Sequence, residues 1–183
     1  MGVFLLVGCD SGGTETVVLN ANSPAPPTVE YEFRYTSDNL NGNSRVEVAS
    51  QNPDNLTSVL RNNGFSRSDV VSAQVDSVTL ERISAAGTQR AAVTPKVFQY
   101  LLGAEVYLGD DDAGPKVAEG QFQTTRRFVS LPVSTRNVTP TVQEGATPTF
   151  LRLEVQDPSS VPDAPNQDAV EVVVYYRIEV EGV

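Results

Sequence analysis

Several residue types that carry catalysis or cross-linking are missing from this chain or nearly so. Its 183 residues include no histidine, no tryptophan, one cysteine and, among 13 basic residues, only two lysines. Without histidine, Ser-His-Asp and Cys-His catalytic sets, histidine general bases and zinc sites with histidine ligands are all excluded. A single cysteine cannot form a disulfide within the chain, so packing has to stabilise the fold.

Positive charge is also scarce. The chain carries 23 acidic residues against 13 basic ones, which gives a net charge of -10 at pH 7. A surface of this sign repels phosphate groups, so we expect no nucleic-acid partner. Beyond the N-terminus, no apolar run approaches the roughly 20 residues that a membrane-spanning helix needs. Any membrane attachment is therefore expected to be through a lipid.

A short motif stands close to the N-terminus. The apolar run Val3-Phe4-Leu5 leads directly into Leu6-Val7-Gly8-Cys9. This string resembles the lipobox of bacterial lipoproteins. The resemblance implies that the Cys9 sulfur is acylated, that the preceding peptide is removed, and that the protein sits in the bacterial cell envelope with the lipid bilayer as a partner. Residues 1–8 are then expected to be the remnant of a truncated signal peptide, because they lack a basic n-region.

Small and turn-forming residues dominate the next segment, which ends in Pro26-Pro27. This composition is typical of a flexible linker that stiffens just before a domain. We therefore predict a lipidated cysteine and flexible tether over residues 9–28 and a single domain over residues 29–183. A chain of this length can bury about 70% of its unfolded surface, which is enough for one core.

Apolar and polar residues alternate in several short segments. Residues 29–35 place Val29 and three aromatic side chains on one face, and an Asn41-Gly42 turn signal before the alternating residues 45–49 predicts a hairpin. Further strands are expected over residues 75–84, 104–108, 127–133 and 147–156. The clearest alternation is at the C-terminus and predicts one long, central strand; its inward positions are Val170, Val172, Val174, Tyr176, Ile178 and Val180.

Only one stretch strongly predicts a helix. Asn52 is a good N-cap and Gly64 a good C-terminal stop, so we expect a helix between them that docks through Leu56, Val59 and Leu60. Residues 66–69 have the spacing of a capping box before a further short turn. The sequence thus predicts an all-β antiparallel sandwich of about seven or eight strands, immunoglobulin-like in general plan, with one short helix.

An acidic loop is expected over residues 109–115, where glycine and proline bound Asp110, Asp111 and Asp112. Three successive carboxylates repel one another, and calcium would relieve that repulsion. The spacing argues against a dedicated site, because adjacent side chains in an extended loop point in different directions. Two interpretations of the loop therefore stay open. It binds calcium as a possible cofactor, or, more simply, it is a solvated hairpin loop.

Three functions stay open at this point. The favoured one is a structural or interaction module that contacts another envelope protein or an extracellular ligand, since the sequence contains no recognisable catalytic set. The second is a calcium-dependent binding module, and the third is a carboxylate-based glycoside hydrolase. If the ligand is a carbohydrate, Tyr107 and Tyr175 are candidate contact residues because both fall opposite the inferred core positions of their strands. The alternative for these two is a cross-strand pair that covers a sheet face.

Overall fold

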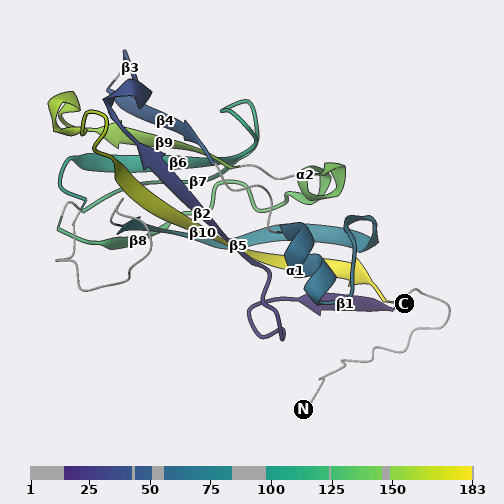
Figure 1. Ribbon diagram of the computed structural model, residues 1–183. Helices are drawn as coiled ribbons and strands as arrows, with labels where there is room; N and C mark the ends of the chain where they lie inside the picture. Colours follow the sequence, from purple (N-terminus) through teal and green to yellow (C-terminus); the bar gives the residue numbers. More distant parts are fainter. Residues whose placement is uncertain are drawn as a thin grey trace.

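The computed structural model describes residues 15–42, 44–50, 56–83, 98–123, 125–145 and 149–182. Within them the chain forms two antiparallel sheets of five strands each (Figure 1). Sheet A contains β1 (Thr16–Leu19), β2 (Thr28–Tyr35), β5 (Val70–Ile83), β8 (Phe128–Leu131) and β10 (Asp168–Glu181). Sheet B contains β3 (Leu40–Asn41), β4 (Arg45–Ala49), β6 (Leu101–Leu108), β7 (Lys116–Gln121) and β9 (Thr149–Val155).

The all-β sandwich predicted from alternation is confirmed, with more strands and one more helix than expected. Two short α-helices accompany the sheets, α1 (Leu56–Asn62) and α2 (Thr139–Glu144). Three single 3-10 turns complete the elements: η1 (Ser37–Asn39), η2 (Arg67–Asp69) and η3 (Pro158–Ser160). Two packed antiparallel sheets are the part of the predicted immunoglobulin-like plan that the structure bears out. No helix in the described ranges is both long and apolar enough to cross a membrane.

Strand β10 is the centre of sheet A, as its sequence predicts. It pairs with β5 on one side and with β2 and then β1 on the other. Every inward position predicted for it, Val170 through Val180, is at most 1% exposed. These side chains belong to one buried cluster with the apolar residues of sheet B, among them Val106, Leu151 and Leu153. The core between the two sheets therefore follows from period-2 burial on both of them.

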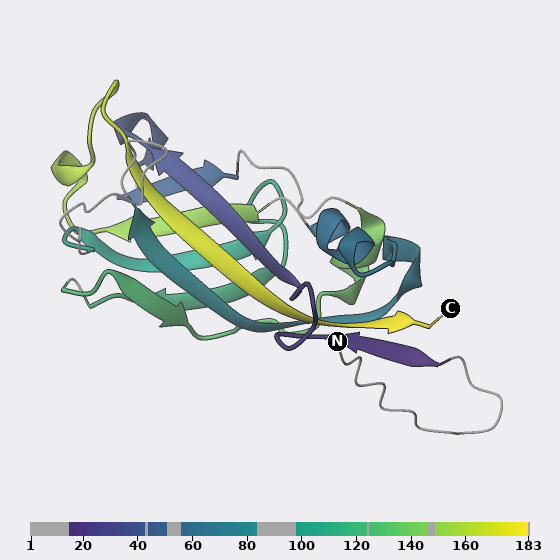
Figure 2. The same ribbon diagram turned by 60° about the horizontal axis from the view of Figure 1, so that its bottom comes forward.

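The long strands β5 and β10 extend past the sandwich, and the helices pack at that end (Figures 1 and 2). The stripe predicted for α1 is confirmed, since Leu56 and Leu60 are fully buried and Val59 packs against the core. Gly64 ends the helix with a φ of +87°, a conformation that glycine adopts without strain. The capping box before η2 is also present, because the Asp69 carboxylate accepts hydrogen bonds from the Ser66 backbone N–H and hydroxyl, both at 2.7 Å.

The predicted hairpin between residues 29–35 and 45–49 is wrong. Strand β2 belongs to sheet A and β4 to sheet B, and the chain crosses between the sheets through η1. The Asn-Gly turn instead closes a smaller hairpin in which Leu40 pairs with Val46 and Asn41 with Arg45. Alternation could not distinguish these outcomes, because it reports which side chains are buried and not which strand lies beside them.

Part of the segment predicted to be a flexible tether is a strand. Residues 16–19 form β1, which pairs with the end of β10 from Thr16 opposite Glu181 to Leu19 opposite Ile178. The Gly182 backbone N–H donates to the Glu15 carbonyl at 2.5 Å and extends this ladder. The ordered body therefore begins before Pro26-Pro27, and Leu19 is buried with the core. Cys9 and residues 10–14 lie outside the described residues.

Candidate functional site

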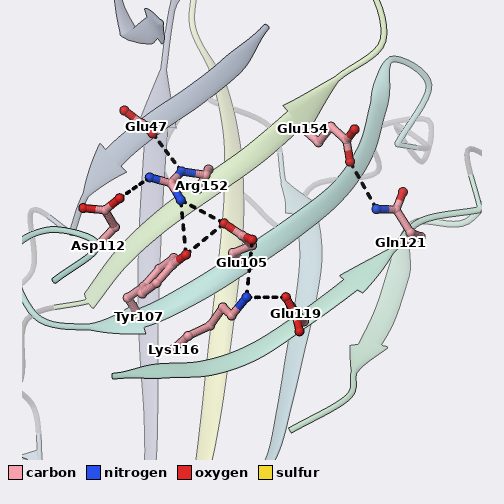
Figure 3. Close-up of polar contacts among 9 residues, drawn as sticks. All are labelled: Glu47, Glu105, Tyr107, Asp112, Lys116, Glu119, Gln121, Arg152 and Glu154. Carbon is pink, nitrogen blue, oxygen red and sulfur yellow. Dashed lines mark hydrogen bonds and ion pairs between the residues drawn. The ribbon is translucent and has the colours of Figure 1, made fainter. Parts of the chain in front are cut away.

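The outer face of sheet B carries a polar array that strand register assembles. Arg152 on β9 lies opposite Glu47 on β4 and Glu105 on β6, and Glu105 in turn lies opposite Glu119 on β7. These four residues cross the sheet as one row, which we call the Arg152 row (Figure 3). Their side chains share the outer face because each occupies the outward phase of its strand.

Arg152 is the centre of this array. Its Nε donates to Glu47 at 2.7 Å, its Nη1 to Glu105 at 3.0 Å, and its Nη2 to Asp112 at 2.5 Å. Partial burial opposes the charged form, but the hydrogen bonds to Asp112, Glu47 and Glu105 raise the pKa of Arg152. Its side chain is only 14% exposed. One guanidinium therefore fixes the positions of three carboxylates from three elements.

Tyr107 lies beneath this arginine and is not an exposed platform. It is 7% exposed, its hydroxyl donates to Glu105 at 2.9 Å, and the Arg152 guanidinium stands 5.6 Å from the ring centroid. Its ring also meets Phe150 edge-on at 6.0 Å between centroids. Burial, then the hydrogen bond to Glu105, raises the pKa of Tyr107. The structure thus contradicts the prediction that Tyr107 is an exposed sugar contact.

Lys116 joins the two acidic residues at the other end of the row. Glu105 and Glu119 are directly opposite each other on β6 and β7, where two negative charges repel. The Lys116 ammonium lies 3.5 Å from Glu105 and forms a close ion pair with Glu119 (Figure 3). Burial opposes ionisation of Glu105, but hydrogen bonds from Tyr107 and Arg152 lower its pKa. A general acid of a glycoside hydrolase needs a raised pKa, and the lowered pKa of Glu105 does not suit that role.

Next to the Arg152 row, the face of sheet B is hollowed. The pocket has a volume of about 270 Å³ and is lined by Arg45, Gly103, Ala104, Glu105, Glu119, Gly120, Gln121, Arg152 and Glu154. In register, Arg45 lies opposite Glu154, Glu154 opposite Gly103, and Gly103 opposite Gln121. A second row therefore runs beside the first, with a glycine in its middle.

A second arginine cluster lies inside the molecule. The Arg82 Nε and Nη2 both donate to the Asp168 carboxylate, the former at 3.3 Å. The Tyr100 hydroxyl donates to the same carboxylate at 2.6 Å, and the Tyr35 and Tyr100 hydroxyls are 3.1 Å apart. All four residues are buried. Since Tyr100 immediately precedes β6 and the other three belong to sheet A, this cluster ties the two sheets together.

The acidic loop joins β6 to β7, but its three carboxylates do not act together. Asp112 is bound to Arg152, Asp111 accepts a hydrogen bond from the Ala113 backbone N–H at 2.9 Å, and Gly109 has the positive φ of a turn. Among the described residues, no group of three or more potential ligands could hold a metal ion. The calcium hypothesis thus receives no support from the placement of these side chains.

Tyr175 belongs to a different sheet from Tyr107. It is half-buried on β10, where its register partners are Thr28 and Ser77. The two tyrosines therefore form neither a common sugar platform nor a cross-strand pair. Cys9 lies outside the described residues, so its lipidation stays a prediction.

No family model matches this chain, and no curated protein matches it at a significant level. Among solved structures, turnip yellow mosaic virus is similar over 87% of this chain and 97% of its own, at 16% identity and a TM-score of 0.35. Desmodium yellow mottle tymovirus is similar over 100% and 97%, at 13% identity and a TM-score of 0.26. Both scores are too low for a shared function to follow.

Proposed function

We propose that this protein is a lipid-anchored protein of the bacterial cell envelope whose β-sandwich serves as a structural or interaction module. The observation that carries the proposal is the lipobox-like Leu6-Val7-Gly8-Cys9, placed six residues before the first strand. Cys9 is the only cysteine in the chain, so it has no competing thiol partner within it. A stable body that starts so soon after the acylated residue suits a protein held close to a membrane.

The pairing of β1 gives the anchored protein an orientation. Residues 10–15 can span at most about 20 Å even when fully extended. They lead into Thr16, which pairs with Glu181 at the C-terminal end of β10. In the anchored protein this end, with α1 and α2, is the membrane-proximal one (Figure 2). Asp168 begins β10 at the other end, about 45 Å away at the usual rise of a strand.

An interaction role is also supported by the outer face of sheet B. Arg152, Glu154 and their partners are held by hydrogen bonds, so little of their conformational entropy remains to be lost when a ligand binds. Such pre-positioned polar groups around a concavity are typical of binding sites. Another envelope protein or an extracellular ligand would reach this face from the side of the anchored sandwich.

Detergent partitioning tests the anchor. We expect the gene, expressed in a bacterial host with a complete signal peptide, to yield a protein that enters the detergent phase of a phase-separating detergent. Cys9→Ala should move it to the aqueous phase, because each buried methylene of the acyl chains contributes about 0.8 kcal/mol and the variant carries none. Cys9→Ser is a matched control that keeps the size of the side chain. If the wild type and both variants partition alike, the anchor proposal fails.

A further inference from the structure

The floor of the pocket on sheet B depends on a residue without a side chain. A Cβ atom added at Gly103 would lie 2.8 Å from the Gly120 carbonyl oxygen and 3.0 Å from Gln121 Nε2. The first contact is closer than real Cβ atoms come and is with backbone that cannot move easily, whereas the second is tight but is with the end of a flexible side chain. The strand therefore needs glycine here, and the missing side chain leaves space on the outer face of β6.

Side chains from the strands on either side of β6 meet across this space. Gln121 Nε2 on β7 donates to Glu154 Oε2 on β9 at 3.1 Å, although the two strands are not neighbours (Figure 3). A larger residue at Gly103 would stand between them. The pocket is thus bounded on one side by this bridge and on the other by the Arg152 row.

The charges around the pocket are largely neutralised by one another. Arg152 and Lys116 both contact Glu105, and Lys116 also contacts Glu119. The lining itself contains two arginines and three glutamates. This near balance gives an inorganic cation or a phosphate little net attraction, and the net charge of -10 disfavours anions further.

Although the charges around the pocket are nearly balanced, several of its donors and acceptors have no hydrogen-bond partner among the described residues. In the part of the chain that the structure describes, no hydrogen bond reaches the Arg45 guanidinium, Glu119 Oε1, Glu154 Oε1 or the Gln121 side-chain oxygen. The first group is a donor and the other three are acceptors. A ligand that fits them has to donate to the three acceptors and accept from the one donor, and the near balance of charge around the pocket favours a neutral ligand.

We propose that this pocket binds the hydroxyl groups of a neutral oligosaccharide. Sugar hydroxyls both donate and accept, so different hydroxyls of an oligosaccharide can donate to Glu154 and Glu119 while others accept from Arg45. The site differs from the tyrosine platform expected from the sequence, because Tyr107 lies under Arg152 and contributes its ring to the array and not to the surface. The inference rests on the proposed role as an interaction module and is independent of the lipid anchor.

Titration of the full ¹⁵N-labelled chain, followed by two-dimensional NMR, tests this inference. The probes are cellotriose, maltotriose and chitotriose, each added up to millimolar concentrations. We expect at least one of them to shift the backbone amide signals of Gly103, Gly120 and Gln121. Glu154→Gln and Arg45→Ala should each weaken that binding about tenfold, the loss expected for one charge-assisted hydrogen bond. Both side chains lie at the surface, so neither change threatens folding.

Glu32→Gln is the matched control, since it makes the same chemical change on the outer face of sheet A and should leave the affinity unchanged. The inference is overturned if none of the three sugars shifts these amides, or if Glu154→Gln and Arg45→Ala bind as the wild type does. It is also overturned if putrescine shifts the same amides and no sugar does, which would make the pocket a cation site. None of these results bears on Cys9, so failure here is separate from failure of the anchor.

Discussion

The two arginine clusters of this molecule use the same kinds of side chain in opposite surroundings. In the interior, the side chains of Arg82 and Asp168 are 5% and 4% exposed, and Arg82 stands 5.2 Å from the Tyr100 ring centroid. On sheet B, Arg152 stands 5.6 Å from the Tyr107 centroid, but its partners Glu47, Glu105 and Asp112 are 30%, 28% and 54% exposed.

Burial explains why the composition of the clusters differs. A buried carboxylate without compensation costs several kcal/mol, so the interior cluster matches Asp168 with a guanidinium and a tyrosine hydroxyl. On the outer face, water and salt screen the charges, and one arginine can be shared by three carboxylates. Removing one partner of the interior cluster should therefore cost much stability, whereas the outer cluster orders a surface.

The largest expected effect comes from breaking the interior cluster. Asp168→Ala leaves Arg82 buried without its carboxylate and should lower the free energy of unfolding by about 3–5 kcal/mol. Urea denaturation measures this loss. The double change Arg82→Met/Asp168→Leu removes both charges, so its free energy of unfolding should be much closer to that of the wild type. A loss below about 1 kcal/mol for Asp168→Ala would show that the interior and outer clusters are energetically alike.

The second expected effect is a loss of stability in alkali. Burial, followed by the hydrogen bond to Asp168, raises the pKa of Tyr100, and burial together with the charge of Asp168 raises that of Tyr35. Both folded-state values lie above the ordinary value of 10.0. Their contribution is therefore fully present below about pH 10 and is lost as the pH rises above it, since the unfolded chain releases its protons first.

Above pH 10, each of these tyrosines should lower the free energy of unfolding by up to about 1.4 kcal/mol per pH unit. Urea denaturation from neutral pH to about pH 11 measures it. Tyr100→Phe should reduce the slope equally at low and high salt. Tyr107→Phe should reduce it less at high salt than at low salt, because burial is the main cause of the raised pKa of Tyr107 but the charge of Glu105, which lies near solvent, adds to it. Equal salt dependence of the two variants would contradict the distinction between the clusters.

Both charged residues of the interior cluster stand at positions that the sequence marks as buried. Arg82 continues the inward phase of Val78 and Leu80 on β5, and Asp168 continues the inward phase of β10 two residues before Val170. A charged residue in phase with core positions, on each of two long strands, indicates a buried ion pair. The partner of each could not be read from sequence, because strand pairing and register are long-range properties.

The outer array could not be predicted from the sequence for the same reason, since it too depends on strand pairing and register. Alternation places Arg152 and Glu105 on outward positions, but only the order β4-β9-β6-β7 makes them neighbours of Glu47 and Glu119. The exposed role expected for Tyr107 was wrong because an outward position near Arg152 is covered by that long side chain. The strands that alternation predicted, the helix at α1 and the Gly64 stop needed only local information, and these predictions are confirmed, whereas β1 was missed.

The smallest expected effect comes from removing the centre of the outer array. Arg152→Met keeps an apolar stem of similar length over Tyr107 but removes the charge that holds Glu47, Glu105 and Asp112. We expect a loss of about 1 kcal/mol at low ionic strength, caused mainly by repulsion among the remaining carboxylates. At about 1 M salt the Debye length is only about 3 Å, so most of this loss should disappear.

Asp112→Asn, at the most exposed of the three partners, should change stability by less than about 0.5 kcal/mol under either condition. Urea denaturation of both variants at the two salt concentrations decides the matter: an Arg152→Met loss as large as that of Asp168→Ala, or one that salt does not reduce, would mean that the outer array supports the fold as the interior cluster does.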